Sequence, residues 1–424
     1  MKKYNILWSI AVALGVVATA CVEDDNPDIS EHPWNYKLTP VNLNYKVPSG
    51  IIMYNASGWW SDAQIMRRIE EPYDAAAGKY GPNVKVSAGD YELFGTNRDY
   101  HEEYAQNLGV IVENVKKAKI DYIITPHIGE DRNKMFPDNI SAQDTVFLNM
   151  LSGHTDTLGW KNDGSMKFAI RFNAQNVADG LGSKDNNTLL EDAAPRVYTV
   201  DGLEYSVPAR DVFLQFVRRL SWFMAEPTYY HFNGRPVLVI DGLRQLYSRD
   251  PKALYDDMRA IIKNEIGKDV YIIARQPQWT PPARWQHFWI EGHADAVVPE
   301  KLTNLENGIG WDRFDMHNIF INEHMKVNRQ YYANLGINYI PSVSPGFSFY
   351  IQDGRWDYPI IRHDPQDFRE RCWSAKMQLG AAPMVIVDAY NEWNFGNAVE
   401  PTDPEYGNGW GDTYLNIIAE EFGK

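Results

Sequence analysis

The chain has almost no cysteine, with only Cys21 and Cys372 among 424 residues. A disulfide framework is therefore excluded, and stability must come from the hydrophobic core. The sequence also has neither the GxSxG turn of serine esterases nor the GxxxxGK[ST] loop that holds nucleotide phosphates. His287 and His293 lack the spacing of a zinc site. These absences argue against an esterase, a nucleotide-dependent enzyme or a zinc enzyme, and we expect no metal and no cofactor.

Long hydrophobic runs are missing as well. The N-terminal apolar run, residues 6–18, is shorter than the ~20 residues that a membrane-spanning helix needs. It follows two lysines and ends in small residues just before Cys21, which is typical of an export signal. Cys21 resembles the lipidated cysteine of a bacterial lipoprotein, and the acidic residues 23–25 resemble the tract that sends Bacteroidetes lipoproteins to the cell surface.

We therefore expect residues 1–20 to be a lipoprotein signal peptide and the protein to be anchored to the outer membrane through a lipid on Cys21, exposed at the cell surface. An ordinary secretory signal followed by a chance cysteine is the alternative. Residues 21–45 are rich in Asp, Asn and Pro without a periodic apolar pattern, which predicts an acidic surface tether. Residues 46–424 are then expected to form a single catalytic domain.

Positive charge is scarce in the mature chain. Without its first 20 residues it has 39 basic side chains against 56 acidic ones, a net charge of −17. Such a surface is a poor match for nucleic acid or anionic lipid. Aromatic residues are abundant by contrast, with 14 Trp, 25 Tyr and 17 Phe. A large core would account for them, and so would sugar binding, because flat rings stack on the CH faces of pyranose rings.

Short β-branched runs alternate with helical patterns along residues 46–424. The candidate strands are residues 51–55, 122–126, 168–172, 236–241, 270–274, 294–298, 339–343 and 384–388. Near-continuous apolar strands separated by amphipathic helices indicate a parallel sheet buried on both faces. Eight such units predict an α/β fold, a (β/α)8 TIM barrel, in preference to a doubly wound sheet. Residues 78–95 and 176–207 are expected to be long loop insertions.

Polar side chains recur where the candidate strands end, which is where a barrel of this kind gathers its chemistry. The main ones are Tyr54, Asn55, Trp59, His127, Arg171, Asn173, Asp241, Arg275, Gln276, Glu300, Ser342, Ser344, Asp388, Tyr390, Asn391 and Glu392. Acidic residues at a cleft, aromatic walls and no cofactor motif favour glycoside hydrolysis, whose usual requirement is two carboxyl groups and a way to hold a sugar.

Two segments carry a resemblance to a known group of enzymes. They are YYHFNGRPVLVIDG, residues 229–242, and YNEWNFGNAVEPTDPEYG, residues 390–407. Both are similar to segments of the glycoside hydrolase family 99 and family 71-like TIM barrels, which include endo-α-mannosidases. The resemblance extends over most of the mature chain, from about residue 50 to residue 422, and implies the same barrel and a substrate with α-linked sugars.

The resemblance implies a mechanism that this sequence matches only in part. In family 99 the last signature supplies two glutamates, one acting as base on the sugar 2-hydroxyl and the other protonating the leaving oxygen. Carried over, the first is Glu392 and the second falls on Phe395, which cannot transfer a proton. Three interpretations stay open. Glu392 works with a carboxyl from elsewhere, or the barrel binds a glycan without cleaving it, or Glu392 is the single essential group.

Four acids could supply a second carboxyl: Asp241, Asp388, Glu291 and Asp90. If the last strand stayed extended, the Cα atoms of Asp388 and Glu392 would lie ~13 Å apart, beyond the ~5–9.5 Å carboxyl separations of glycosidases. Asp241 ends a different strand, so we favour it. A structural role is an equal alternative for either Asp, since Asp commonly ends strands and opens turns.

We thus expect catalysis by Glu392 with Asp241 and Asp388. The substrate-binding candidates are Tyr54, Asn55, Trp59, His127, Arg171, Asn173, Arg275, Tyr390, Asn391 and Trp393. For the arginines an ion pair with a rim Asp is the simpler interpretation, and for the tryptophans core packing is. The expected partners are an oligosaccharide or polysaccharide substrate and neighbouring glycan-uptake proteins, and nucleic acid is not among them.

Overall fold

The computed structural model describes residues 36–54, 62–87, 100–129, 139–156, 159–183, 188–243, 246–277, 279–282, 288–300, 317–355 and 360–424. The chain divides into two compact units, Met1–Leu38 and Thr39–Lys424. Nearly all described residues belong to the second unit, which holds every described helix and strand. The expected signal peptide and Cys21 lie outside the described residues, so these expectations and the predicted domain boundaries stay predictions.

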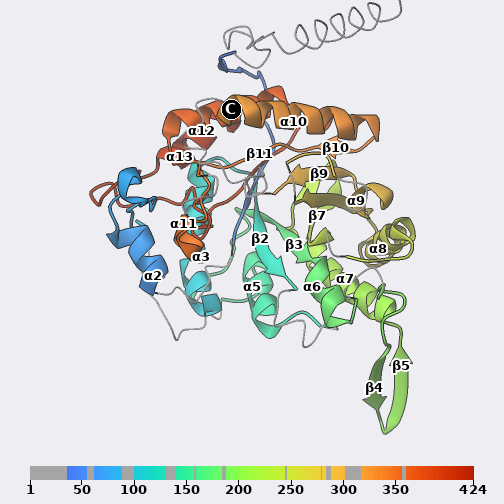
Figure 1. Cartoon of the computed structure of the whole chain (residues 1–424). Helices are drawn as coiled ribbons and strands as arrows, with labels where there is room; N and C mark the ends of the chain where they lie inside the picture. The colour runs from blue at the N-terminus through green and yellow to red at the C-terminus, as the bar shows by residue number, and fades with distance from the viewer. Residues whose placement is uncertain are drawn as a thin grey trace, which may run out of the picture. The chain divides into compact units, whose positions relative to one another are not determined.

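Within the described residues, eight parallel strand segments follow one another in chain order around one sheet (Figure 1). They are β1 (Ser49–Ile52), β2 (Tyr122–Ile128), β3 (Lys167–Asn173), β7 (Arg235–Asp241), β8 (Tyr271–Gln276), β9 (Ala296–Pro299), the pair β10 (Asn338–Tyr339) and β11 (Ser342–Val343), and β12 (Val385–Val387). Because β1 pairs with both β2 and β12, the last strand returns to the first. The predicted (β/α)8 barrel is confirmed.

The seventh strand is split, and its two halves close the ring. β10 pairs with β9, whereas β11 pairs with β12. Between the halves, the Ile340 N–H donates to the Val297 carbonyl at 2.9 Å, and the Pro341 carbonyl accepts from the Ile386 N–H at 3.1 Å. Proline has no N–H to give to a ladder. Pro341 therefore sits where the strand changes partner, and the predicted strand 339–343 is two short pieces.

Alternate residues of the barrel strands enter two separate cores, as the period of two requires. The inner core fills the barrel and includes Ile52, Ile124, Ala169, Val239, Ile273 and Ile386. Tyr122 closes part of it by stacking on Tyr230, with ring centroids 3.7 Å apart. The outer core lies between strands and helices and includes Ile51, Ile123, Ile170, Leu238, Ile272 and Val387. The strands are thus apolar on both faces, as predicted.

Helices cover the outer core (Figure 1). The longer ones are α3 (Tyr100–Lys117), α5 (Ala142–Ser152), α7 (Ala209–Met224), α8 (Pro251–Ile266), α10 (His317–Asn334), α12 (Pro365–Met377) and α13 (Thr413–Phe422). Short turns are α2 (Asp62–Ile65), η2 (Met66–Glu70), η3 (Ala75–Ala77), α6 (Ala174–Gly180), α9 (Phe288–Glu291) and α11 (Tyr350–Asp353). None of the described helices is long and apolar enough to cross a membrane.

Helix α8 shows how the sequence sets a boundary. The Asp250 side chain accepts a hydrogen bond from the Ala253 N–H, and Pro251 occupies the first turn. Gly267 ends the helix at φ 72°, in the left-handed region that glycine tolerates best. Helix α8 therefore ends at Gly267.

The predicted loop at residues 176–207 is not all loop. It contains the hairpin β4 (Arg196–Val200) and β5 (Leu203–Val207), which projects from the barrel in Figure 1. Its turn is Asp201-Gly202, both at positive φ, as a two-residue type I′ turn requires. A second addition, β6 (His231–Phe232), pairs antiparallel with β7.

Candidate functional site

Polar side chains line the mouth of the barrel, at the C-terminal ends of the strands. Every second residue of a strand points into the barrel, and the inward residue that follows the last inner-core residue is polar. These pairs are Ile52 and Tyr54, Ala169 and Arg171, Val239 and Asp241, Ile273 and Arg275, and Ile386 and Asp388. In β2 the register shifts between Ile124 and His127. That irregularity brings His127 to the same level. We call Tyr54, His127, Arg171, Asp241, Arg275 and Asp388 the mouth cluster.

Two arginines and two aspartates form a buried ion-pair network in this cluster. Arg171 Nε donates to Asp241 Oδ2, and Arg275 Nη2 donates to Asp388 Oδ2. Arg275 Nη1 lies 3.2 Å from Asp241 Oδ1. All four residues are at most 3% exposed. Arg275 therefore bridges the carboxylates that end β7 and follow β12, on different sides of the barrel.

The network fixes the charge of Asp241. Burial by itself would raise the pKa of this carboxyl, but the Arg171 and Arg275 guanidiniums and His127 outweigh it and hold the pKa well below its usual range. Since an ionised carboxylate only accepts hydrogen bonds, the contact of 3.0 Å between His127 Nε2 and Asp241 Oδ2 requires His127 to carry a proton on Nε2. Asp241 thus orients the imidazole.

Tyr54 is the common neighbour of the mouth residues. Its hydroxyl accepts from Arg275 Nη1 at 3.3 Å, and its ring lies under the Arg171 guanidinium, 4.4 Å from the centroid. Burial raises the pKa of Tyr54, the two arginines lower it, and the carboxylates of Asp388 and Glu392 raise it again. Tyr54 therefore stays a neutral phenol, and Glu392 is close enough for its charge to act on Tyr54.

The segment after β12 is held to β1 and to itself. The Asn391 side chain accepts from the Tyr54 N–H at 2.9 Å and donates to the Tyr54 carbonyl at 3.1 Å. Asn397 and Ser344 both donate to the Asp388 carbonyl oxygen. This double tie between Asn391 and Tyr54 places Glu392, the next residue, at the mouth.

Two residues in this segment have structural partners. Trp393 Nε1 donates to Glu400 Oε2 at 2.8 Å, and the Arg68 guanidinium covers the Trp393 ring at 4.0 Å. Phe395 stacks on Phe347 at 6.4 Å and meets Phe349 edge-on at 5.4 Å. Phe395 is therefore an aromatic packing residue at the position where family 99 places its second glutamate.

The other predicted site residues have various positions, and some of them lie outside the described residues. Tyr390 points into the outer core, where it is 1% exposed and its hydroxyl accepts from Asn114. Its expected contact with sugar is not supported. Asn173 caps α6, accepting from the Asn176 N–H at 3.2 Å. Asn55, Trp59 and Asp90 lie outside the described residues. Glu291 ends α9 before β9 begins, so it lies at the opposite end of the barrel and cannot be the second carboxyl.

The residues that sequence patterns missed are Arg68 and Trp410. Arg68 lies in the short helix η2 and Trp410 in the loop before α13, and neither is at a strand end, so only their contacts with the Trp393 ring identify them. Among the described residues no group of three or more His, Cys, Asp and Glu is placed to hold a metal ion.

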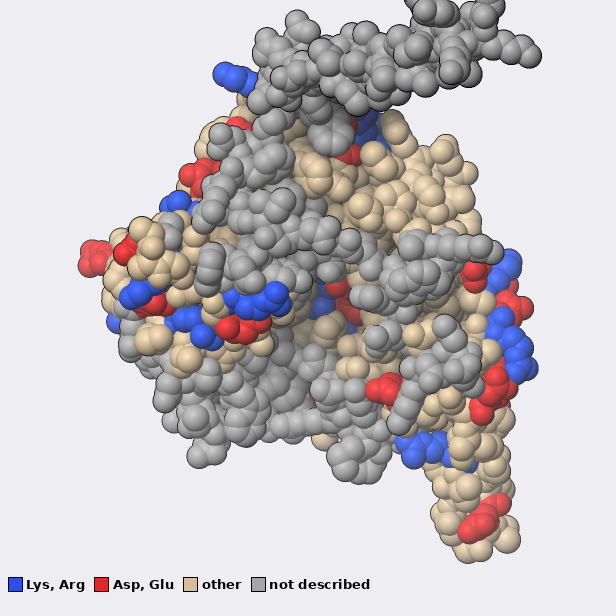
Figure 2. Space-filling view, in the orientation of Figure 1, with Lys and Arg blue, Asp and Glu red and all other residues tan. Residues whose placement is uncertain are grey.

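On the described part of the face shown in Figure 2, acidic and basic side chains are interspersed, without a large patch of either sign.

Comparison with known proteins supports the fold. No family model and no curated protein matches the chain. A solved structure described as a glycoside hydrolase-like protein is similar, with a TM-score of 0.67 and 20% identity over 92% of this chain and 97% of that one. A family 99 endo-α-mannosidase from Bacteroides thetaiotaomicron gives a TM-score of 0.47 at 12% identity, covering 88% of this chain and 96% of its own. A β-glucosidase from Thermotoga maritima gives a TM-score of 0.45 at 8% identity, covering 91% of this chain and 99% of its own.

The first of these similarities shows that the chain has the fold of a glycoside hydrolase-like TIM barrel. At these identities the likeness extends to the fold alone, so the chemistry must be argued from the mouth cluster.

Replacing Asp241 tests the ion-pair network. Asp241→Asn leaves two buried guanidiniums short of a counter-charge, so we expect the free energy of unfolding to fall by roughly 3–5 kcal/mol near neutral pH. Because the folded pKa of Asp241 is lowered, its contribution is complete above the unfolded pKa of about 3.9 and is lost as the pH falls through the folded pKa. Urea unfolding of the wild type and of Asp241→Asn should therefore show a difference in the free energy of unfolding that becomes smaller below about pH 4.

The matched control is Asp256→Asn, since Asp256 pairs with Lys252 at the surface and should change stability by less than about 0.5 kcal/mol. If Asp241→Asn lowers the free energy of unfolding no more than the control does, the ion-pair network is contradicted.

Proposed function

We propose that this protein is a cell-surface glycosidase that cleaves α-linked sugars, with Glu392 as its main catalytic carboxylate. The observation that carries the proposal is the double hydrogen bond that holds the segment after β12 against β1. Through it the Asn391 side chain binds the Tyr54 backbone and places the next residue, Glu392, at the mouth, where the resemblance to family 99 puts the base. Asp241 and Asp388, by contrast with the role that their strand-end positions predict, are paired with Arg171 and Arg275.

Asp241 suits a different role from the catalytic one that its strand-end position predicts. A carboxylate held ionised by two guanidiniums cannot deliver a proton to a leaving oxygen. It can stabilise positive charge that develops on a sugar ring, and it orients His127 at 3.0 Å. We therefore assign Asp241 and Asp388 to holding the charges of the mouth in place.

His127 is the candidate for the proton transfer that Phe395 cannot perform. Its side chain is 21% exposed, against 5% for Asp241 and 2% for Arg171, so it faces the open side of the cluster. An imidazolium has a proton on each ring nitrogen, and the bond from Nε2 to Asp241 fixes the orientation of the ring. In this account Glu392 takes the proton of the attacking sugar hydroxyl, and His127, doubly protonated with its Nε2–H held by Asp241, gives its Nδ1 proton to the leaving oxygen.

A noncatalytic glycan-binding protein is the second candidate. The packing of Phe395 between Phe347 and Phe349 favours it, because the position of the family's second glutamate is filled by a ring that belongs to a cluster. In that case the mouth would hold a sugar through Tyr54, His127 and the neighbouring polar groups without cleaving it.

Product analysis separates the two candidates. Purified protein is incubated with α-mannans, α-glucans and plant polysaccharides, and released oligosaccharides are quantified by chromatography. We expect wild-type protein to release product, and Glu392→Gln and His127→Asn each to lose roughly 10²-fold or more of the rate. Glu405→Gln, an exposed change further along the same segment, is the control. Full activity of Glu392→Gln refutes the proposed role of Glu392, and absence of any product supports the binding protein.

The cell-surface location rests on the N-terminal sequence. If Cys21 carries the lipid anchor, Cys21→Ser should move the protein from the outer-membrane fraction to the soluble fraction of expressing cells. The second cysteine provides the control, because Cys372 is fully buried and Cys372→Ala should leave the distribution unchanged. Retention of the Cys21→Ser variant at the membrane would contradict lipid anchoring.

A further inference from the structure

A hollow lies among the loops that follow β1, β11 and β12. Its volume is about 620 Å³, within the ~300–1,000 Å³ typical of small-molecule sites. Its lining residues lie within residues 72–83, 348–351, 360–365 and 396–414. None of these is a member of the mouth cluster, so the hollow is a separate site. We call it the Trp410 cavity.

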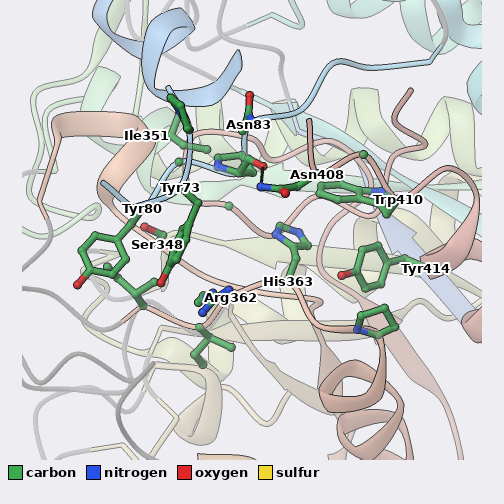
Figure 3. Close-up of a pocket in the computed structure, with 18 of the residues that line it drawn as sticks. Tyr73, Tyr80, Asn83, Ser348, Ile351, Arg362, His363, Asn408, Trp410 and Tyr414 are labelled. Carbon is green, nitrogen blue, oxygen red and sulfur yellow. Dashed lines mark hydrogen bonds between the residues drawn. The ribbon is translucent and has the colours of Figure 1, made fainter. Parts of the chain in front are cut away.

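Aromatic rings form both ends of the Trp410 cavity. Figure 3 shows Tyr73 and Tyr80 at one end, Trp410 and Tyr414 at the other, and His363 between them. Tyr73 and Tyr80 meet edge-on with centroids 5.8 Å apart, and Trp410 and Tyr414 do so at 5.3 Å. Tyr80 and Tyr414 are buried, at 7% and 1% exposed, so the rings that the cavity presents at its two ends are the half-buried Tyr73 and Trp410.

Trp410 is held in place from several directions. Its backbone N–H donates to Thr402 Oγ1 at 2.7 Å, and its Nε1 donates to the Glu400 carbonyl at 2.9 Å. One ring face stacks with His363 at 4.5 Å, and the ring also stacks with Trp393 at 5.6 Å. A ring fixed in this way loses little freedom when a ligand binds, which favours affinity.

The polar groups of the cavity are almost all neutral. Among its described lining residues there is no Asp, Glu or Lys, although the whole chain has a net charge of −15. Burial lowers the pKa of His363 to about 4, so this ring is uncharged near neutral pH. Arg362 is the lining cation, and its guanidinium lies 4.1 Å from the centroid of the Tyr73 ring.

The lining also includes the amides of Asn83 and Asn408. Asn408 donates from its side chain to the Pro82 carbonyl at 3.2 Å and from its backbone to the Asn83 carbonyl at 3.0 Å. Two loop segments far apart in the sequence are thereby joined at the wall of the cavity. Asp364 and Asp412 flank the lining and cap α12 and α13, which offsets Arg362 and disfavours an anionic ligand.

From these features we propose that the Trp410 cavity binds a short, uncharged stretch of glycan, separately from the mouth. Tyr73 and Trp410 would contact the apolar faces of sugar residues, while the amides and Arg362 would bond to hydroxyl groups. The choice of carbohydrate as ligand rests on the proposed function. The stacked rings of Trp393, Trp410 and His363 connect this cavity to the segment that carries Glu392.

Isothermal titration calorimetry on the full chain tests the proposal. The Glu392→Gln protein is titrated with α-mannotetraose and maltotetraose as neutral probes and with tetragalacturonate as an anionic one. We expect binding of a neutral probe, weakened about tenfold or more by Trp410→Ala and by Arg362→Gln. Arg362 is exposed, so its replacement spares the fold. Trp222→Ala changes a tryptophan that is 55% exposed on α7 and should leave the affinity unchanged.

Three results would overturn the proposal: no heat with either neutral probe, equal affinity in Arg362→Gln and its parent, or binding of the uronate alone. The result is independent of catalysis. If wild-type protein releases no product while the cavity variants weaken binding, the Trp410 cavity stands and the glycosidase assignment fails. If product is released and the cavity variants bind as their parent does, the glycosidase assignment stands and the proposal for the Trp410 cavity fails.

Discussion

The mouth of this barrel depends on one side chain, Arg275, and on the two carboxylates that it joins. A buried guanidinium is costly unless it is paired, and removing one partner leaves a charge with nothing to compensate it. Arg275 contacts Asp241 at the end of β7 and Asp388 just after β12. Arg275 lies on β8, and Arg171 on β3 adds a fourth strand by pairing with the same Asp241. Strands from different sides of the barrel are thus joined at one level.

The chemistry we propose follows from this arrangement. Charges that hold a structure together must keep their ionisation state, and Asp241 does so because its pKa is held low by the neighbouring cations. We assign proton transfer to two other groups, His127, which contacts Asp241, and Glu392, which follows β12. Phe395 is consistent with this division, since the ring cluster of Phe347 and Phe349 has taken over a position that would otherwise carry an acid.

Much of the fold could be predicted from the sequence, because strand periodicity is a local property. Eight apolar runs predicted the barrel, and strand ends predicted that Tyr54, His127, Arg171, Asp241, Arg275 and Asp388 would meet. Which of them pair could not be predicted, since pairing depends on register and barrel geometry. Tyr390 shows the limit of the strand rule, because the chain leaves the period of two after β12 and turns this ring outward. The β4–β5 hairpin was missed because its strands are exposed and lack an apolar face pattern typical of the barrel strands.

A double-mutant cycle between Arg275 and Asp388 tests the central claim most directly. Free energies of unfolding in urea are measured for the wild type, Arg275→Met, Asp388→Asn and the double variant. If Arg275 bridges the two carboxylates as described, the double variant should be more stable than the sum of the single losses predicts, by about 1.5–3 kcal/mol. Losses that add to within about 0.5 kcal/mol would show that the residues act independently, and the division between structural and catalytic carboxylates would lose its basis.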